Sequence, residues 1–164
     1  MVTAYSSQDW SDLFVASASA SAALTGLLFV AVSVNIERIL EFSGLPERAL
    51  QTLLLLLSVV AISLIGLIPG QTATALGVEL LVLSVGFCTA ICWLLNRTMS
   101  GAREYERAGL HLAYTVPGAL APVVGAVSLL AGAGGGLYWI AAGIVGAILG
   151  ASVNAWVLMV EILR

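Results

Sequence analysis

The sequence predicts an all-α membrane protein, a polytopic bundle of five transmembrane helices with its N-terminus outside and its C-terminus in the cytoplasm. The first observation behind this prediction is composition: of 164 residues, 60% are hydrophobic and only 9% are charged. A soluble protein carries about 25% charged residues because its surface faces water. Most of this surface must therefore face lipid. The other two observations are the apolar segments and the positions of the arginines.

Five segments are long and apolar enough to cross a bilayer. A helix needs about 20 largely apolar residues to cross a hydrocarbon core of ~30 Å. The segments cover residues 13–34, 49–68, 73–95, 110–131 and 137–160. We assign all of them to a single integral membrane domain, 1–164. The second and third segments are joined by a very short link, as are the fourth and fifth, which predicts that each pair is antiparallel.

The first segment follows residues 1–12, which contain Asp9 and Asp12 and no basic residue. A signal peptide begins with basic residues and has a shorter apolar core. We therefore expect a retained span, although the alanines and serines at 16–20 imitate a cleavage site. The next stretch, 36–42, mixes apolar and charged residues, and we expect it to extend the first helix at the level of the lipid headgroups.

Helix-breaking residues mark the ends of the later segments. Gly44 is expected to end one helix, and Pro46 fits the first turn of the next. Pro69 and Gly70 end the second segment, and the glycines at 134–136 separate the fourth from the fifth.

The arginines predict the orientation. The chain has six basic residues, all arginine, and a five-span arrangement puts all of them on one side of the membrane. The positive-inside rule assigns that side to the cytoplasm. These arginines are Arg38, Arg48, Arg97, Arg103, Arg107 and Arg164. Aromatic residues near both ends of the spans fit the interfacial belts of a membrane protein. The absence of Lys beside abundant Ala, Gly, Leu and Val suggests a GC-rich bacterium, so we expect the plasma (inner) membrane.

The composition and the motifs argue against several classes of function. A net charge of −3 without clustered basic residues argues against nucleic acid. Cys88 and Cys92 share one apolar segment that lacks the further ligands of a zinc site, so we expect them to fill space in the packing. The sequence contains no HExxH, Walker or GxSxG motif. We therefore expect no enzyme activity, no cofactor and no metal.

Two faces of small residues predict close helix–helix contacts. In the fifth segment one face carries Ala142, Gly146, Gly150 and Asn154, and Gly26 belongs to the face of the first segment. Small residues let helix backbones approach in lipid, and a buried amide finds a partner there. We expect these faces to pack helices within the chain or between copies in a homo-oligomer.

A hydroxyl stripe and two carboxylates allow a different interpretation. Ser17, Ser21 and Thr25 are spaced by four residues, so they line one helix face, which serves either packing or a wet path. Glu79 lies about two turns inside the third segment from its outer end and has no basic residue near it to neutralise it. It must reach the interface, stay protonated or face water. With Asp12 it would give an outer mouth that attracts cations.

Two functions therefore remain open. The sequence favours a non-enzymatic accessory or scaffold protein that lies in the lipid bilayer and binds helices, as a homo-oligomer or with other membrane proteins. The alternative is a homo-oligomeric channel for cations. A third hypothesis, lipid or apolar ligand binding between bent helices, depends on Pro117 and Pro122 in the fourth segment.

Overall fold

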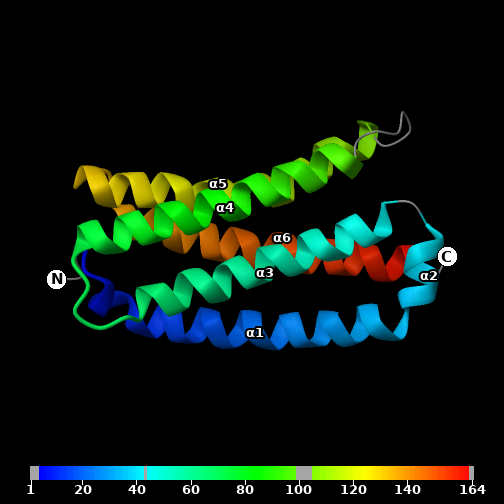
Figure 1. The fold of residues 1–164 in the computed structure, drawn as a ribbon, viewed down its shortest axis with the longest axis horizontal. Coiled ribbons are helices and arrows are strands. Elements are labelled where there is room, and N and C mark those ends of the chain that lie inside the picture. Colours follow the sequence, from blue (N-terminus) through cyan, green and yellow to red (C-terminus); the bar gives the residue numbers. More distant parts are fainter. Residues whose placement is uncertain (1–3, 43, 99–104, 163–164) are drawn as a thin grey trace.

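The computed structural model describes residues 4–42, 44–98 and 105–162, and every regular element among them is a helix (Figure 1). This confirms the all-α class. In chain order the elements are the short 3-10 helix η1 (Ser7–Trp10), α1 (Ser11–Val34), α2 (Ile36–Glu41), α3 (Leu45–Gly66), α4 (Ala73–Thr98), α5 (Tyr105–Ala131) and α6 (Gly136–Ile162).

The long helices lie close to the predicted segments, with one difference at the first connection. Helix α3 begins at Leu45, four residues before the predicted span, and this confirms the helix boundary predicted from Gly44 and Pro46, because Gly44 takes a positive φ of 90° and Pro46 occupies the first turn. The stretch after α1 is not a continuation of that helix. Asn35, with φ −109° and ψ 18°, separates α1 from α2, so α2 is a short helix of its own.

Four helices in the described part of the chain are long and apolar enough to cross a membrane. They are Ser7–Val34, Leu45–Gly66, Ala73–Arg97 and Gly136–Val160, with mean hydropathies between 1.9 and 2.3. Within α5, the apolar stretch of this kind is the shorter Thr115–Ala131. The chain is therefore a multi-pass membrane protein with four candidate spans, and the fifth span stays a prediction.

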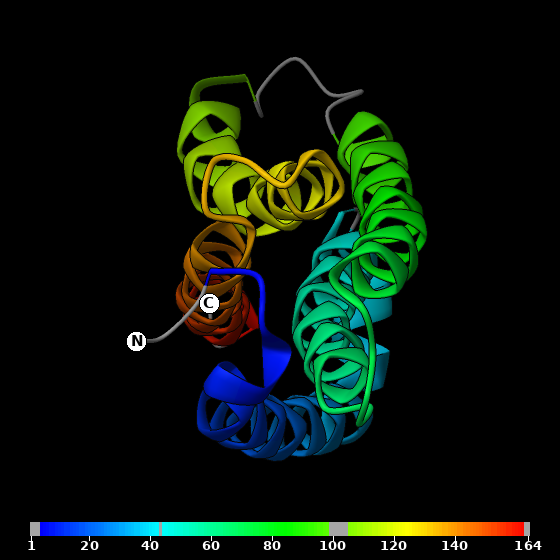
Figure 2. The same ribbon diagram turned by 90° about the vertical axis from the view of Figure 1, so that its left-hand side faces the viewer.

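The bundle has two distinct ends. The α3–α4 and α5–α6 links lie beside η1 at one end, which we call the Tyr5 end, and α2 lies at the other, which we call the α2 end (Figure 1). Viewed along the bundle, α3, α4, α5 and α6 form a ring and α1 lies outside it (Figure 2). Helix α1 packs against α3 and makes only slight contact with α6.

Burial follows this arrangement. Helix α3 touches α1, α4 and α6, and 56% of its most apolar window is buried, against 22% for the window in η1 and α1. Leu55, Val59 and Ile62 of α3 belong to the centre of the core. Helix α1 is therefore a peripheral helix with most of its surface open to lipid.

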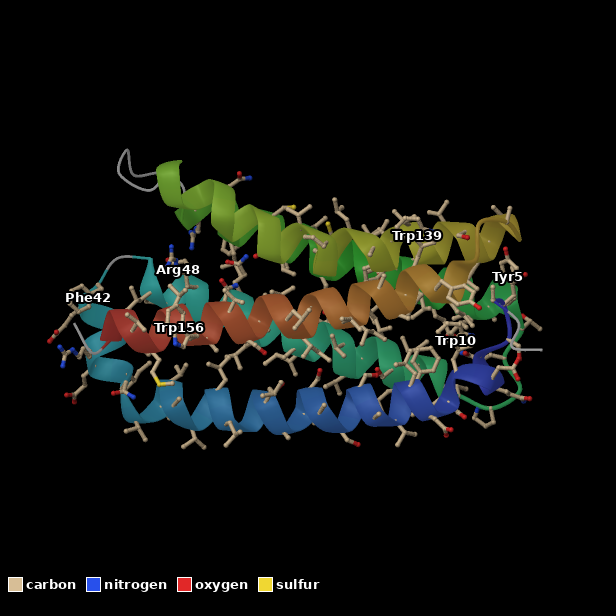
Figure 3. All side chains as sticks on the ribbon, turned by 180° about the vertical axis from the view of Figure 1, so that it is seen from behind. Tyr5, Trp10, Phe42, Arg48, Trp139 and Trp156 are labelled. Carbon is tan, nitrogen blue, oxygen red and sulfur yellow. The ribbon has the colours of Figure 1, made fainter. Side chains whose placement is uncertain are left out.

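The Tyr5 end is closed by contacts between the first residues and the start of α6 (Figure 3). The backbone N–H of Gly135 donates to the Tyr5 hydroxyl at 3.1 Å. Trp10 meets Tyr138 edge to face, with ring centroids 4.9 Å apart. Gly135 has a φ of 73°, which suits glycine and lets the α5–α6 link turn sharply. The N-terminal segment thus ties α1 to the beginning of α6 at this end.

Candidate helix-packing surfaces

Helices α5 and α6 pack with their backbones in near contact. A Cβ added to Gly118 would lie 2.7 Å from the Cα of Ala147, and one added to Gly143 would lie 2.6 Å from the Cδ of Pro122. Both distances are shorter than real side chains allow, so both positions require glycine. Small residues in lipid commonly serve to bring two helices this close. This surface, which we call the α5–α6 seam, is occupied within the chain.

The predicted small-residue face of α6 lies partly on this seam. Gly150 and Asn154 are buried and Gly146 is half-buried, with an added Cβ 3.4 Å from the backbone N of Gly118. Ala142, by contrast, is exposed. The centre of the contact runs through Gly143 and Ala147 instead, one position further along the helix than the predicted face.

The hydroxyl stripe of α1 faces α3. The Ser17 and Ser63 hydroxyls are 2.8 Å apart in a buried hydrogen bond between the two helices. Ser21 is fully buried, and the Thr25 hydroxyl donates to the Ser21 carbonyl oxygen at 2.7 Å. The ring of Phe14 fills the space in front of Gly66, where an added Cβ would lie 2.6 Å from the ring. We call this surface the α1–α3 seam.

The two candidate acidic residues lie on different helices. Asp12 is exposed in the first turn of α1, and Glu79 is exposed on α4. The Gln71 amide donates to a Glu79 carboxylate oxygen at 2.6 Å, so Glu79 is bonded to the α3–α4 link. Within one chain the hydroxyl stripe and the two carboxylates therefore do not share one face, and a common path would need several copies.

Small residues also cover the side of α1 that points away from α3. This open α1 face consists of Ala16, Ser19, Ala20, Ala23 and Gly26, all of them exposed. A Cβ added to Gly26 would meet nothing within 4 Å. The Ser19 hydroxyl donates to the Val15 carbonyl oxygen at 2.8 Å, so its polar group is satisfied within its own helix. Nothing in the described part of the chain covers this face.

Sequence reasoning missed a buried polar group in the ring. Gln51 of α3 is fully buried, and its amide donates to the Thr115 hydroxyl of α5 at 3.3 Å. The Oε1 atom of Gln51 and the Nδ2 atom of Asn154 are buried without a hydrogen-bond partner. Gln51 stands near the beginning of its span, where it resembles an ordinary interfacial residue. Its only distinguishing signal is that the apolar run begins before it.

The described residues hold no cluster of side chains that could bind a metal ion. No group of three or more His, Cys, Asp or Glu side chains gathers there. Cys88 is half-buried and Cys92 is exposed, and both are free thiols. Towards the α2 end of α4, the Arg97 guanidinium carbon lies 4.3 Å from the centre of the Trp93 ring, a cation–π contact typical of an interfacial position.

Comparisons with known proteins found no match to this chain, whether against models of protein families, curated proteins or solved structures.

Proposed function

We propose that this chain is a five-span protein of the bacterial plasma membrane that acts without catalysis, as an accessory or scaffold protein, by binding helices in the bilayer. The open α1 face is the observation that carries the proposal. Lipid tails are as apolar as leucine, so helices associate in lipid through close packing of small residues instead of hydrophobic burial. The open α1 face offers that kind of surface and has no partner helix in the described chain.

The partner that we propose is a second copy of the chain, with two open α1 faces in contact. A two-fold interface uses the same patch on both copies, which a face on one straight helix satisfies. The face carries no charge, and its one polar side chain, Ser19, already has an acceptor, so two copies meet without unpaired polar groups.

For orientation we propose that the α2 end faces the cytoplasm. Arg38 in α2, Arg48 in the first turns of α3 and Arg97 in the last turn of α4 support this, because all three belong to segments at the α2 end. Trp10 and Tyr138, which meet at the other end, suit the opposite interface. A membrane-impermeant label should therefore reach a tag on the N-terminus of intact cells and miss a tag on the C-terminus.

Oxidative cross-linking tests the second copy directly. In a background with Cys88→Ser and Cys92→Ser, single cysteines at Ala16, Ala20 and Ala23 are expected to join two copies in the native membrane. A cysteine at Val82 of α4, which is 71% exposed, is the matched control and is expected to stay monomeric. Equal cross-linking at Val82, or none on α1, would contradict the proposed contact.

The alternative function, a channel for cations, gives a different result in liposomes. It predicts cation flux from the purified protein that falls after Glu79→Gln and after Thr25→Leu. We expect no such flux, because Glu79 is bonded to Gln71 and Thr25 to its own helix. Cation flux that falls after both substitutions would support the channel and contradict the scaffold.

A further inference from the structure

Helices α1 and α6 enclose a groove in the half of the bundle towards α2. At the Tyr5 end α1 is tied to α6 through Trp10 and Tyr138, but beyond this point the two helices are in little contact. The space between them has a volume of ≈ 400 Å³ and is lined mainly by α1 and α6, with Leu56 of α3 contributing as well. The groove therefore exists because α1 follows α3 and leaves α6.

The lining of the groove is apolar. Leu28, Leu56, Ala151 and Leu158 are buried side chains of its wall, while Leu27 and Met159 are exposed at its rims. Two of the lining residues, Asn35 and Ser152, have polar side chains, and each bonds to a carbonyl of its own helix. The Asn35 amide donates to the Ala31 oxygen at 2.9 Å, and the Ser152 hydroxyl donates to the Ile148 oxygen at 2.8 Å.

Water is a poor occupant of this groove, because an ordered water needs two to four polar partners and the lining offers few free ones. An empty groove is also unfavourable, since its lining would lose its dispersion contacts. The volume and the apolar lining of the groove fit a single flexible hydrocarbon chain.

We propose that the groove binds one acyl chain of a phospholipid from the leaflet at the α2 end. Helices α1 and α6 are both candidate spans, so the groove faces the hydrocarbon of the bilayer. Asn35, which lines the groove, directly precedes α2, where Arg38 is exposed and available to a lipid phosphate. The proposal depends on the membrane-spanning arrangement. Leu27 shares its helix face with Ala20 and Ala23, so Met159 of α6 is the readout that is independent of the contact between copies.

Photolabelling tests the occupant. The purified chain is placed in liposomes containing a phospholipid with a diazirine in the middle of one acyl chain, and the labelled residues are mapped by mass spectrometry. We expect Leu27 and Met159 to be labelled about threefold more than Val82 of α4, although all three are similarly exposed. The ratio is modest because lipid tails are as apolar as the groove.

Filling the groove provides the matched comparison. Ala31 is an exposed residue of the groove lining, and Ala31→Trp is expected to bring labelling at Met159 down to the level of Val82. Ala142→Trp places the same bulk on an exposed position of α6 away from the lining and is expected to leave it unchanged. If Ala31→Trp alters the circular dichroism spectrum, Leu27→Trp, one turn earlier on α1, takes its place, with Met159 as the readout.

Uniform labelling of exposed residues on all helices would overturn the proposal, as would labelling at Met159 that survives the tryptophan. Cross-linking between copies through a cysteine at Met159 would show that a second chain, instead of lipid, covers the groove. None of these results bears on cross-linking through Ala20, so failure here is distinguishable from failure of the proposed self-association.

Discussion

The α5–α6 seam and the open α1 face are both rich in small residues, yet among the described residues only the seam joins two helices. On α6, Gly143 lies against Pro122 and Ala147 lies against Gly118. The small residues of α6 therefore already pack against α5, the preceding helix in the chain. On α1, Phe14 and Leu28 are buried together with Ser17 and Ser21, while Ala16, Ala20 and Ala23 are exposed beside large residues such as Leu27 and Phe29. Small residues on a helix therefore suit a close contact, but they do not show by themselves which face the neighbouring helix covers.

The largest expected effect comes from breaking the α5–α6 seam. Gly118→Leu forces a side chain into the backbone of Ala147, and we expect a loss of about 3 kcal/mol or more in the free energy of unfolding, at the upper end of overpacking effects. Gly86→Leu on α4 is the control, because an added Cβ there meets nothing within 4 Å. Denaturation in micelles followed by circular dichroism measures both. Equal losses would mean that the seam is not the closest contact.

The second-largest effect is expected from removing the ring of Phe14, the bulky residue of the α1–α3 seam. We expect Phe14→Ala to lower the free energy of unfolding by about 2 kcal/mol, less than the 3–5 kcal/mol found in water-soluble cores, because lipid solvates phenylalanine in the unfolded state. Phe29→Ala, at a position 63% exposed on the same helix, should cost little. The same denaturation experiment applies. A similar loss for both would show that α1 is not held through Phe14.

Substitutions on the open α1 face are expected to weaken self-association and to change the stability of the monomer very little. We expect Ala20→Ile with Ala23→Ile to weaken self-association about tenfold, equivalent to ~1.4 kcal/mol, because the two backbones are kept apart. The stability of the monomer should change by less than about 0.5 kcal/mol, since both sites are exposed. Energy transfer between labelled copies in liposomes measures the association. Unchanged energy transfer would show that the open α1 face contacts lipid instead of a second copy.

The smallest effect is expected from the hydrogen bond between Ser17 and Ser63. A double-mutant cycle with both alanine substitutions should give a coupling of about 0.6 kcal/mol, the average for such bonds between membrane helices. The value can be compared with the Phe14 effect to divide the α1–α3 seam into its polar and apolar parts. A coupling larger than the loss from Phe14→Ala would make the hydroxyl stripe the principal contact.

Much of the fold was predictable from sequence because lipid imposes strict lengths and polarity on each span. The apolar runs predicted the long helices closely, and Gly44 and Pro46 predicted where α3 begins. Of the predicted transmembrane helices, the described residues support four, and the orientation stays a prediction. The interruption at Asn35 was not predicted, because a single Asn between apolar residues is a weaker helix stop than Gly or Pro.

The candidate sites were less predictable, for a physical reason. Spacing along one helix shows which residues share a face, but it does not show where the neighbouring helix lies. Ala142 and Gly150 belong to the same predicted face, yet one is exposed and the other buried. The buried bond of Gln51 to Thr115 depends on the approach of α3 and α5, which are far apart in the chain.

The ties at the Tyr5 end have a consequence for biogenesis. Tyr5 and Trp10 reach partners at Gly135 and Tyr138, which the ribosome delivers only after most of the polypeptide has been made. The end of α1 beside Tyr5 is therefore secured only after the beginning of α6 has been made. Until then the packing of α1 on α3 holds the helix, and its end beside Tyr5 stays accessible to other helices in the bilayer.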